Sequence, residues 1–179
     1  MEQVVERILV SEADLKAKVK ELGESISTDY AGKDLLVVGI LKGALVFMAD
    51  LIRSIRIPIQ IDFMAVSSYG QGTRSSGAVR ILKDLDRAIE EKHILIVEDI
   101  VDTGLTLNYL LDNLKSRGAA SVKVCTILDK PSRRKIPITP DYNGFVIPDE
   151  FVIGYGLDYA EDYRHLPYVA VLKPEVYSK

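Results

Sequence analysis

The chain has 179 residues, of which 47% are hydrophobic and 27% charged, and its formal net charge is −3. This length and composition predict one folded domain with a substantial core and argue against a disordered chain. The small acidic excess argues against a nucleic-acid-binding protein, because such proteins normally carry a basic face.

The cysteine content and the apolar runs bear on cellular location. Cys125 is the single cysteine and lies in the apolar run 122–128, so we expect a buried core thiol and no disulfide framework. No apolar run approaches the length of a membrane span, and the amino terminus is too charged and too short in apolar residues for a signal peptide. We therefore expect a cytoplasmic protein.

Residues 11–32 predict a helix. Ser11 is the expected N-cap, and acidic residues follow it in the first turn. Five apolar residues then recur at helical spacing, and Gly32 closes the element. They are Leu15, Val19, Leu22, Ile26 and Tyr30. This helix is expected to be part of the scaffold.

Residues 34–55 predict a buried strand that leads into a second helix. The strand covers Asp34–Leu41 and the helix Leu45–Ile55, with Lys42 and Gly43 at the junction. The amino terminus of a helix that follows a strand can bind a phosphate. On these residues alone, however, a lysine beside a glycine turn is more often simply solvated.

Residues 59–92 predict two strands joined by a long polar loop. Ile59–Ser67 alternates as a strand does, and Ala78–Lys83 is the expected returning strand, followed by a charged, solvated connection. The intervening residues 68–77 contain three glycines and five hydroxyl-bearing residues, which predicts a mobile loop. The loop is either a plain connection or a lid that closes over a site and excludes water.

The rest of the chain is organised around residues 93–106, HILIVEDIVDTGLT. Ile94–Val97 reads as a central strand of a parallel sheet, and Glu98 and Asp99 follow at its carboxyl end, where open α/β sheets bind ligands. Residues 102–104 predict a turn into a helix over 105–114, whose unpaired N–H groups would face an anion. The alternative is an ordinary strand, turn and helix, with solvated acids and Asp102 as an N-cap.

The later elements repeat this pattern. Gly118 ends the central helix, and Ser121–Leu128 predicts another buried strand, with Lys130 just beyond its carboxyl end. Residues 133–135, Arg-Arg-Lys, are interpreted as a surface basic cluster. Residues 140–149 predict a loop rich in turn formers, and Tyr168–Leu172 predicts an edge strand.

Four motifs together resemble one family: LKG at 41–43, SSYG at 67–70, VEDIVDTGLT at 97–106 and FVIGYGLDYAEDYR at 151–164. The chain resembles the type I phosphoribosyltransferases and, in detail, the bacterial hypoxanthine-guanine phosphoribosyltransferases, over about residues 9–174. The resemblance implies an α/β fold with a central, mostly parallel sheet flanked by helices, and a small hood. It also implies a flexible lid loop at about 68–77, with Ser68 and Tyr69 in the lid. Neither a GxGxxG nor a Walker motif occurs, which removes the commonest rival nucleotide folds.

The resemblance implies a site for 5-phosphoribosyl pyrophosphate (PRPP). Glu98 and Asp99 would orient the ribose hydroxyls, and Arg164 would hold pyrophosphate. Lys42 and Gly43 would contact pyrophosphate through the backbone, in a loop that often contains a cis peptide bond, here between residues 41 and 42.

The 5′-phosphate would bind to the turn that opens the central helix. Its residues are Asp102, Thr103, Gly104, Leu105 and Thr106. Several relatives have lysine at position 105, so phosphate binding here would depend more on backbone N–H groups and hydroxyls. Mg²⁺ is the expected cofactor, because carboxylates and phosphates suit a hard cation. Its implied ligands, direct or through water, are Glu98, Asp99 and Asp158.

The implied base site lies in the second half of the chain. Phe151 would stack on the purine, and Val152 would read the base edge through its backbone. Lys130 would donate to the exocyclic oxygen of a 6-oxopurine and so disfavour adenine. The other implied purine-binding residues are Ile100, Leu157 and Asp158.

The function implied by the resemblance is purine salvage. The reaction is the Mg²⁺-dependent transfer of 5-phosphoribosyl from PRPP to a ring nitrogen of hypoxanthine or guanine, which gives IMP or GMP and pyrophosphate. Asp102 would be the catalytic base or the acceptor of the purine N7–H. The expected partners are these small molecules, with no nucleic acid and no membrane, and a homodimer or homotetramer is implied. A xanthine-preferring enzyme and a nucleotide-sensing RNA-binding regulator on the same fold remain alternatives, and a regulator should carry a contiguous basic face.

Overall fold

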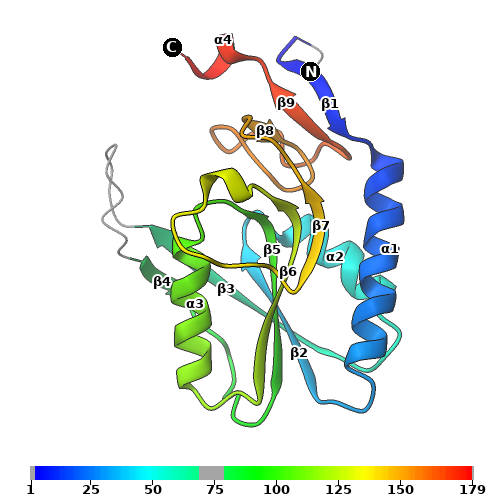
Figure 1. Ribbon diagram of the computed structural model, residues 1–179, viewed down its shortest axis with the longest axis vertical. Coiled ribbons are helices and arrows are strands. Elements are labelled where there is room, and N and C mark those ends of the chain that lie inside the picture. Colours follow the sequence, from blue (N-terminus) through cyan, green and yellow to red (C-terminus); the bar gives the residue numbers. More distant parts are fainter. Residues whose placement is uncertain (1–2, 69–78, 179) are drawn as a thin grey trace.

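The computed structural model describes residues 3–68 and 79–178. It contains two sheets with helices around the larger one (Figure 1). In chain order the elements are β1 (Val5–Val10), α1 (Glu12–Asp29), β2 (Leu35–Leu41), α2 (Leu45–Ser54), β3 (Gln60–Ser68), β4 (Val79–Lys83), β5 (His93–Val101), α3 (Leu105–Ser116), β6 (Ser121–Asp129), the short 3₁₀ helix η1 (Pro131–Arg133), β7 (Tyr142–Val146), β8 (Val152–Ile153), β9 (Val169–Leu172) and α4 (Pro174–Tyr177).

The larger sheet has the order β4-β3-β2-β5-β6-β7 and is parallel except for β4. The structure therefore confirms the expected α/β class and the central, mostly parallel sheet. Strand order reverses between β2 and β5, because β3 lies on one side of this pair and β6 on the other. Ligands of open α/β sheets bind at such a switch point, beyond the carboxyl ends of the strands.

The pairing of β5 shows how a cleft opens at this point. β2 and β5 pair in register only as far as Gly39 and Val97. Beyond Val97, β5 continues to pair with β6 as far as Val101, while β2 continues to pair with β3 as far as Leu41. The two central strands therefore separate where Glu98 and Asp99 begin.

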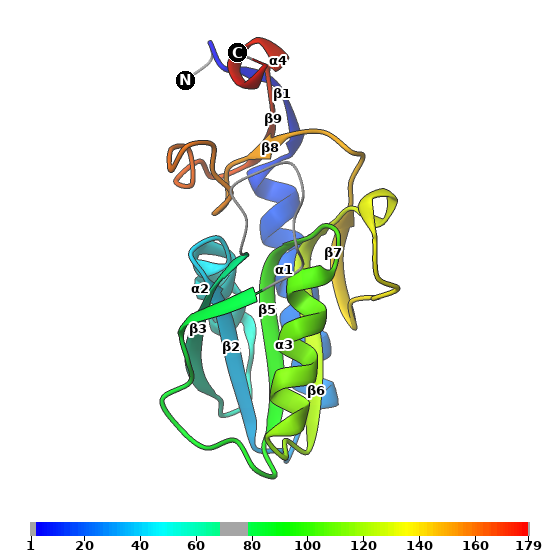
Figure 2. The same ribbon diagram turned by 90° about the vertical axis from the view of Figure 1, so that its left-hand side faces the viewer.

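Helices cover both faces of this sheet, as Figures 1 and 2 show for α1, α2 and α3. One core cluster joins α1 and α2 to Val37, Leu95 and Val97, and the other joins α3 to Leu36 and Ile96. The alternation of residues between the two clusters follows from the two-residue period of a strand. Because both faces are covered, β2 and the Ile94–Val97 part of β5 are apolar without interruption, as the sequence predicted.

The first helix forms as expected. The Ser11 hydroxyl accepts a hydrogen bond from the Asp14 N–H at 3.1 Å, which confirms the N-cap. All five apolar residues that recur at helical spacing are buried. The helix ends at Asp29, with Tyr30 as C-cap, rather than at Gly32. The predicted buried thiol of Cys125 is also confirmed.

The smaller sheet, which we call the hood, has the order β1-β9-β8. It joins the two ends of the chain, and α4 lies at its outer end (Figures 1 and 2). Sequence reasoning missed β1 and was wrong about 168–172, because β9 is the central strand of this sheet rather than an edge strand. The loop prediction for 140–149 was also wrong in part, since β7 lies within it and pairs with β6.

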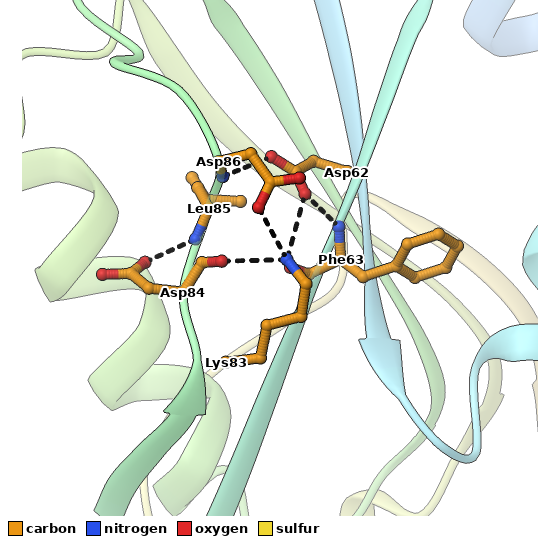
Figure 3. Close-up of polar contacts among 6 residues, drawn as sticks. All are labelled: Asp62, Phe63, Lys83, Asp84, Leu85 and Asp86. Atoms are coloured by element: carbon orange, nitrogen blue, oxygen red, sulfur yellow. Dashed lines mark hydrogen bonds and ion pairs between the residues drawn. The ribbon is translucent and has the colours of Figure 1, made fainter.

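A polar cluster ties the β3–β4 hairpin to the connection that follows it (Figure 3). Lys83 Nζ lies 3.0 Å from the carbonyl oxygen of Phe63, 2.9 Å from that of Asp84, 3.3 Å from Asp86 Oδ1 and 3.5 Å from Asp62 Oδ1. We call Asp62, Phe63, Lys83, Asp84, Leu85 and Asp86 the Lys83 cluster. The connection 84–92 is therefore not simply solvated, and Ile89 within it is buried.

Two further findings concern the predicted loop and the helices. The backbone of Ser68 ends β3, whereas Tyr69 and the rest of the predicted lid lie outside the described residues. In the described part of the chain, no helix is both long and apolar enough to cross a membrane.

Candidate active site

A cavity of about 270 Å³ lies at the switch point. Its walls come from the end of β2, the end of β5, the turn into α3 and one arginine of the hood loops. They include Leu41, Gly43, Glu98, Asp99, Ile100, Asp102, Thr103, Gly104, Thr106 and Arg164. The structure thus brings together most of the residues that the resemblance assigned to PRPP.

The end of β2 approaches β5 very closely. A Cβ atom on Gly43 would lie 1.9 Å from Asp99 Oδ2, so only glycine fits there without displacing the carboxylate. The peptide bond between Leu41 and Lys42 is cis, as the resemblance implied. On its other side, the carbonyl oxygen of Gly43 lies against Gly156 of the hood loop, where a Cβ would come within 2.0 Å of it. The backbone at Gly43 is therefore held between β5 and the hood.

The turn into α3 forms a pocket of backbone and hydroxyl groups. Gly104 is the N-cap of α3 and has a φ of +84°, a left-handed conformation that favours glycine. Thr103 and Thr106 line the cavity, and the first N–H groups of the helix are free of helical partners. Leu105 itself is not among the lining residues. This arrangement suits an anion such as a phosphate.

The two acids of β5 are adjacent in the sequence, with Glu98 buried and Asp99 half-buried. Burial raises the pKa of Glu98 well above its ordinary value, and the charge of Asp99 adds to this. Burial also raises the pKa of Asp99, to about 6, against the effect of the Ile100 N–H, which lies 2.8 Å from Asp99 Oδ1. In the described part of the chain, no side-chain hydrogen bond reaches Glu98. Carboxyl groups with spare hydrogen-bonding capacity can bind sugar hydroxyls.

Arg164 enters the same cavity from the hood loops. Its Nη1 donates to the Gly156 carbonyl at 2.8 Å, and its Nη2 lies 3.1 Å from Asp158 Oδ1. Its Nε is buried without a hydrogen-bond partner within the described residues. A buried donor without a partner costs free energy unless an acceptor arrives, so a bound anion would satisfy it.

The side chain of Lys42 lies apart from this cavity. Its Nζ forms an exposed ion pair with Glu161 Oε2 at 2.5 Å, which lowers the pKa of Glu161. Lys42 does not line the cavity, whereas its neighbours Leu41 and Gly43 do. The structure is therefore compatible with a backbone role for this loop, which is what the resemblance implied.

A second, larger cavity of about 770 Å³ adjoins the first. It lies between the end of β5, the segment after β6 and the hood. Its walls include Asp99, Ile100, Asp102, Lys130, Arg133, Phe151, Val152, Leu157, Asp158 and Tyr177. Asp99, Ile100 and Asp102 line both cavities, so the two meet at the end of β5.

Every residue assigned to the purine lines the second cavity. Lys130 is 7% exposed, and burial lowers its pKa. Its Nζ donates to the Glu150 carbonyl at 2.5 Å, which leaves further N–H donors for a ligand. Phe151 is 38% exposed, and Leu157 is buried beside it in the wall. A flat apolar surface next to a cationic donor suits a planar heterocycle that carries a carbonyl oxygen.

Two arginines hold Asp102 in place. Arg133 Nε lies 2.8 Å from Asp102 Oδ1, and Arg133 Nη1 lies 3.5 Å from an oxygen of Asp149. Arg134 Nη1 donates to the backbone carbonyls of Val101 and Asp102 at 3.0 and 2.9 Å. Arg133 thus occupies one carboxylate oxygen of Asp102, and the second oxygen is left for another donor.

These contacts correct the interpretation of 133–135 as a surface cluster. The Arg134 side chain is 13% exposed and is ion-paired with Asp129, so it belongs to the interior. Arg133 is exposed but lines the second cavity. Sequence reasoning missed both arginines, together with Tyr177, because no local pattern shows which distant groups they contact.

The fit of a magnesium ion can be tested against the described acids. No group of three or more histidine, cysteine or carboxylate side chains is preassembled in the described part of the chain. The charge of Asp158 nevertheless raises the pKa of Asp99 while that of Arg164 lowers it, and Arg164 Nη2 lies 3.1 Å from Asp158 Oδ1, so these charged groups lie near one another. Mg²⁺ is commonly held by one or two carboxylates together with substrate phosphates and water. These acids therefore fit a magnesium ion that arrives with a phosphorylated substrate.

The fold and the two cavities define an α/β protein with a site suited to a sugar phosphate beside a heterocycle. Comparison with known proteins identifies the family: the Phosphoribosyl transferase domain matches residues 9–160. The chain belongs to the phosphoribosyltransferase family, which confirms the resemblance.

Individual relatives agree with this assignment. The chain is 55% identical to the hypoxanthine-guanine phosphoribosyltransferase of Lactococcus lactis, with 100% of this chain and 97% of that protein covered. It is 55% identical to the enzyme of the same name from Bacillus subtilis, with 99% of each covered. The crystal structure of a hypoxanthine phosphoribosyltransferase from Staphylococcus aureus matches with a TM-score of 0.97 and 52% identity, with 100% of this chain and 97% of that chain covered.

Some relatives are longer proteins. The chain is 53% identical over 179 residues to the bifunctional protein TilS/HprT of Listeria monocytogenes and spans 28% of its length.

Proposed function

We propose that this protein transfers the 5-phosphoribosyl group of PRPP to hypoxanthine or guanine, giving IMP or GMP and pyrophosphate. The observation that carries the proposal is the meeting of two cavities at Asp99, Ile100 and Asp102. One cavity suits a phosphorylated sugar and the other a flat heterocycle, so a bond between ribose and base would form where they join. The names of the close relatives support the same reaction.

The first cavity holds PRPP in this proposal. The turn 102–106 binds the 5′-phosphate through N–H groups and the hydroxyls of Thr103 and Thr106. Glu98 and Asp99 orient the ribose hydroxyls. The backbone at Lys42–Gly43 and the guanidinium of Arg164 hold pyrophosphate, and the unpartnered Arg164 Nε is the donor best suited to it.

The second cavity holds the purine. Phe151 and Ile100 pack against the two faces of the base, and Lys130 donates to its 6-oxygen. Val152 and Leu157 complete the apolar wall. Adenine carries an amino group at the 6-position, which has no acceptor oxygen for the Lys130 ammonium, so a 6-oxopurine is preferred.

The chemistry is a substitution at the ribose C1. The bond from C1 to pyrophosphate breaks while the bond from C1 to the purine nitrogen forms, and positive charge develops on the ribose ring. Arg164 stabilises the negative charge that builds on the leaving pyrophosphate. Asp102 accepts the purine N7–H with the oxygen that Arg133 does not occupy, which orients the base and can remove its proton.

A magnesium ion is part of the proposal. Asp99, Asp158 and Glu98 are the residues that would hold it, and a bound Mg²⁺ would neutralise pyrophosphate charge.

A panel of bases tests the proposed function. The protein is incubated with PRPP and MgCl₂ and with hypoxanthine, guanine, xanthine or adenine, and pyrophosphate release is followed. Turnover with the first two bases and not with adenine is expected, and removal of the metal with EDTA should abolish it. A preference for xanthine would favour the alternative substrate, and no turnover with any base would contradict the proposal.

The competing proposal, an RNA-binding regulator, is tested by measuring RNA binding at increasing salt concentration. Such a protein should bind RNA with an affinity that falls steeply as salt rises. We expect no salt-dependent RNA binding, because the chain has a net charge of −3 and the two arginines of the site, Arg133 and Arg164, are paired with acids.

Several expectations stay predictions. They are the organisation as one domain over residues 1–179, the homodimer or homotetramer, the cytoplasmic location and the role of Ser68 and Tyr69 in a lid.

A further inference from the structure

Three aromatic rings meet at the wall of the second cavity. The rings of Phe151 and Tyr177 are stacked, with centroids 5.1 Å apart and planes 22° apart. The ring of Tyr159 meets Phe151 nearly perpendicularly, with centroids 5.7 Å apart. Tyr177 is the last residue of α4, far from Phe151 in the sequence, and no motif pointed to it. Both stacked rings line the cavity and are over one-third exposed.

Tyr177 covers one face of the Phe151 ring. Offset-stacked aromatic rings have centroids roughly 4.5–7 Å apart, so Phe151 and Tyr177 are in direct contact and no base fits between them. Helix α4 lies at the outer end of the hood, beyond β8 and β9 as seen from the end of β5 (Figures 1 and 2). Tyr177 therefore supports one face of the Phe151 ring from the carboxyl-terminal segment, and Phe151 lines the cavity that Ile100 at the end of β5 also lines.

Helix α4 is itself anchored. The Tyr159 hydroxyl donates to the Val176 carbonyl at 3.1 Å. The Lys173 N–H donates to the Val4 carbonyl at 2.9 Å, and Lys173 Nζ donates to the Gln3 carbonyl at 2.9 Å. The carboxyl-terminal segment is thus fixed to the residues just before β1 and to Tyr159, whose ring also contacts Phe151. A side chain on so short a helix would otherwise have little to hold its position.

We propose that Tyr177 is a positioning residue for the base: by stacking on one face of Phe151, it fixes the ring plane on which the purine stacks. The inference rests on the proposed function, since it assigns a role within the base site. Without Tyr177, the Phe151 side chain could rotate, and ordering it would oppose base binding. PRPP binds in the other cavity in this proposal, so the KM for PRPP should not change.

The first experiment compares steady-state constants of the wild type, Tyr177→Ala and Tyr177→Phe. We expect Tyr177→Ala to raise the KM for hypoxanthine and guanine about 3- to 10-fold, the range that an aromatic pair contributes. The kcat and the KM for PRPP should stay within twofold. Tyr177→Phe should restore the wild-type KM for the base, because stacking needs the ring and not the hydroxyl. Glu175→Ala is the matched control, because Glu175 is an exposed side chain of the same helix that does not line the cavity.

The second experiment is a double-mutant cycle with Phe151→Leu. If Tyr177 acts through Phe151, Tyr177→Ala should have almost no further effect on the KM for the base in the Phe151→Leu background. Independent, additive effects would overturn the inference. So would an unchanged or lowered KM for the base in the single Tyr177→Ala variant, or a parallel rise in the KM for PRPP. Absence of turnover by the wild type with every base would instead overturn the proposed function itself.

Discussion

Two polar regions of this protein place charged groups out of water in opposite ways. In the Lys83 cluster, Asp62 is 7% exposed but accepts from the N–H groups of Phe63 and Asp86 at 2.7 and 2.9 Å and lies near Lys83 (Figure 3). At the end of β5, Glu98 is buried and Asp99 half-buried, both with few hydrogen-bond donors within the described residues, and burial raises the pKa of both.

The two lysines show the same contrast. Lys83 is surrounded by the four oxygens of the Lys83 cluster, whereas the buried Lys130 has one acceptor within the described residues, the Glu150 carbonyl. Charged groups that satisfy one another stabilise the fold, whereas charged groups with unused donors or acceptors are available to a ligand. The comparison therefore separates a structural region from a functional one, and the two should respond differently to substitution.

The largest expected effect is on turnover. Asp102→Asn keeps the shape of the side chain but removes the negative charge that would accept the purine proton. We expect kcat to fall about 10²- to 10⁴-fold, the range for loss of a general base, with the KM for PRPP and the melting temperature little changed. Stopped-time assays of pyrophosphate release and a thermal melt measure these quantities. Equal losses in turnover and in PRPP affinity would remove the catalytic role of Asp102.

Removal of the Lys130 ammonium should affect the base alone. Lys130→Met should raise the KM for hypoxanthine and guanine roughly 10- to 100-fold, because hydrogen bonds to charged groups contribute about 1.5–3 kcal/mol. The KM for PRPP should stay within about twofold. Lys135→Met is the matched control, since this nearby exposed lysine lines neither cavity. An unchanged preference among 6-oxopurines and adenine would count against the assigned donor.

The structural region should lose stability rather than activity. Asp62→Asn weakens the contacts with Lys83 and the Asp86 N–H and should cost about 1–3 kcal/mol of unfolding free energy. For a chain of this size that lowers the melting temperature by about 2–4 °C per kcal/mol. Asp86→Asn is the control, because its 74% exposed carboxylate should contribute less than about 1 kcal/mol. At a temperature where Asp62→Asn remains folded, its turnover should equal that of the wild type. A loss of turnover there would contradict the assignment of the Lys83 cluster to a structural role.

The smallest expected effect is a gain in stability. Because burial raises the pKa of Glu98, its contribution to stability is full below the unfolded value of about 4.3 and is lost as pH rises through the folded value. Glu98→Gln removes the titrating carboxyl group, and with it this loss of stability at high pH. We expect its melting temperature to exceed that of the wild type at pH 7.5, with the difference vanishing near pH 4. Scanning calorimetry across pH tests the sign, and a variant less stable than the wild type at pH 7.5 would show that Glu98 is satisfied after all.

Local patterns were sufficient for the elements whose cause is local. The Ser11 cap and the helical spacing after it specified α1, and the uninterrupted apolar runs specified β2, β5 and β6 as covered strands. The order of acids, threonines and glycine after β5 also indicated the phosphate-binding turn. These features depend on residues within a few positions of one another.

Contacts between distant residues could not be found in this way. β1 is short and largely exposed, and it forms a strand only because β9, from the other end of the chain, pairs with it. Arg134 is buried by partners at Asp129, Val101 and Asp102, although its neighbours in sequence suggest a surface charge. Tyr177 reaches Phe151 across the hood.

By itself, then, the sequence determined the family, the parallel core and the residue types at the end of β5, because hydrophobic period, capping and turn chemistry act over a few residues. Only the tertiary structure decided which carboxylates are satisfied and which are not, and which rings and arginines surround the site. Hydrogen bonding and desolvation depend on neighbours that folding brings together from distant parts of the chain.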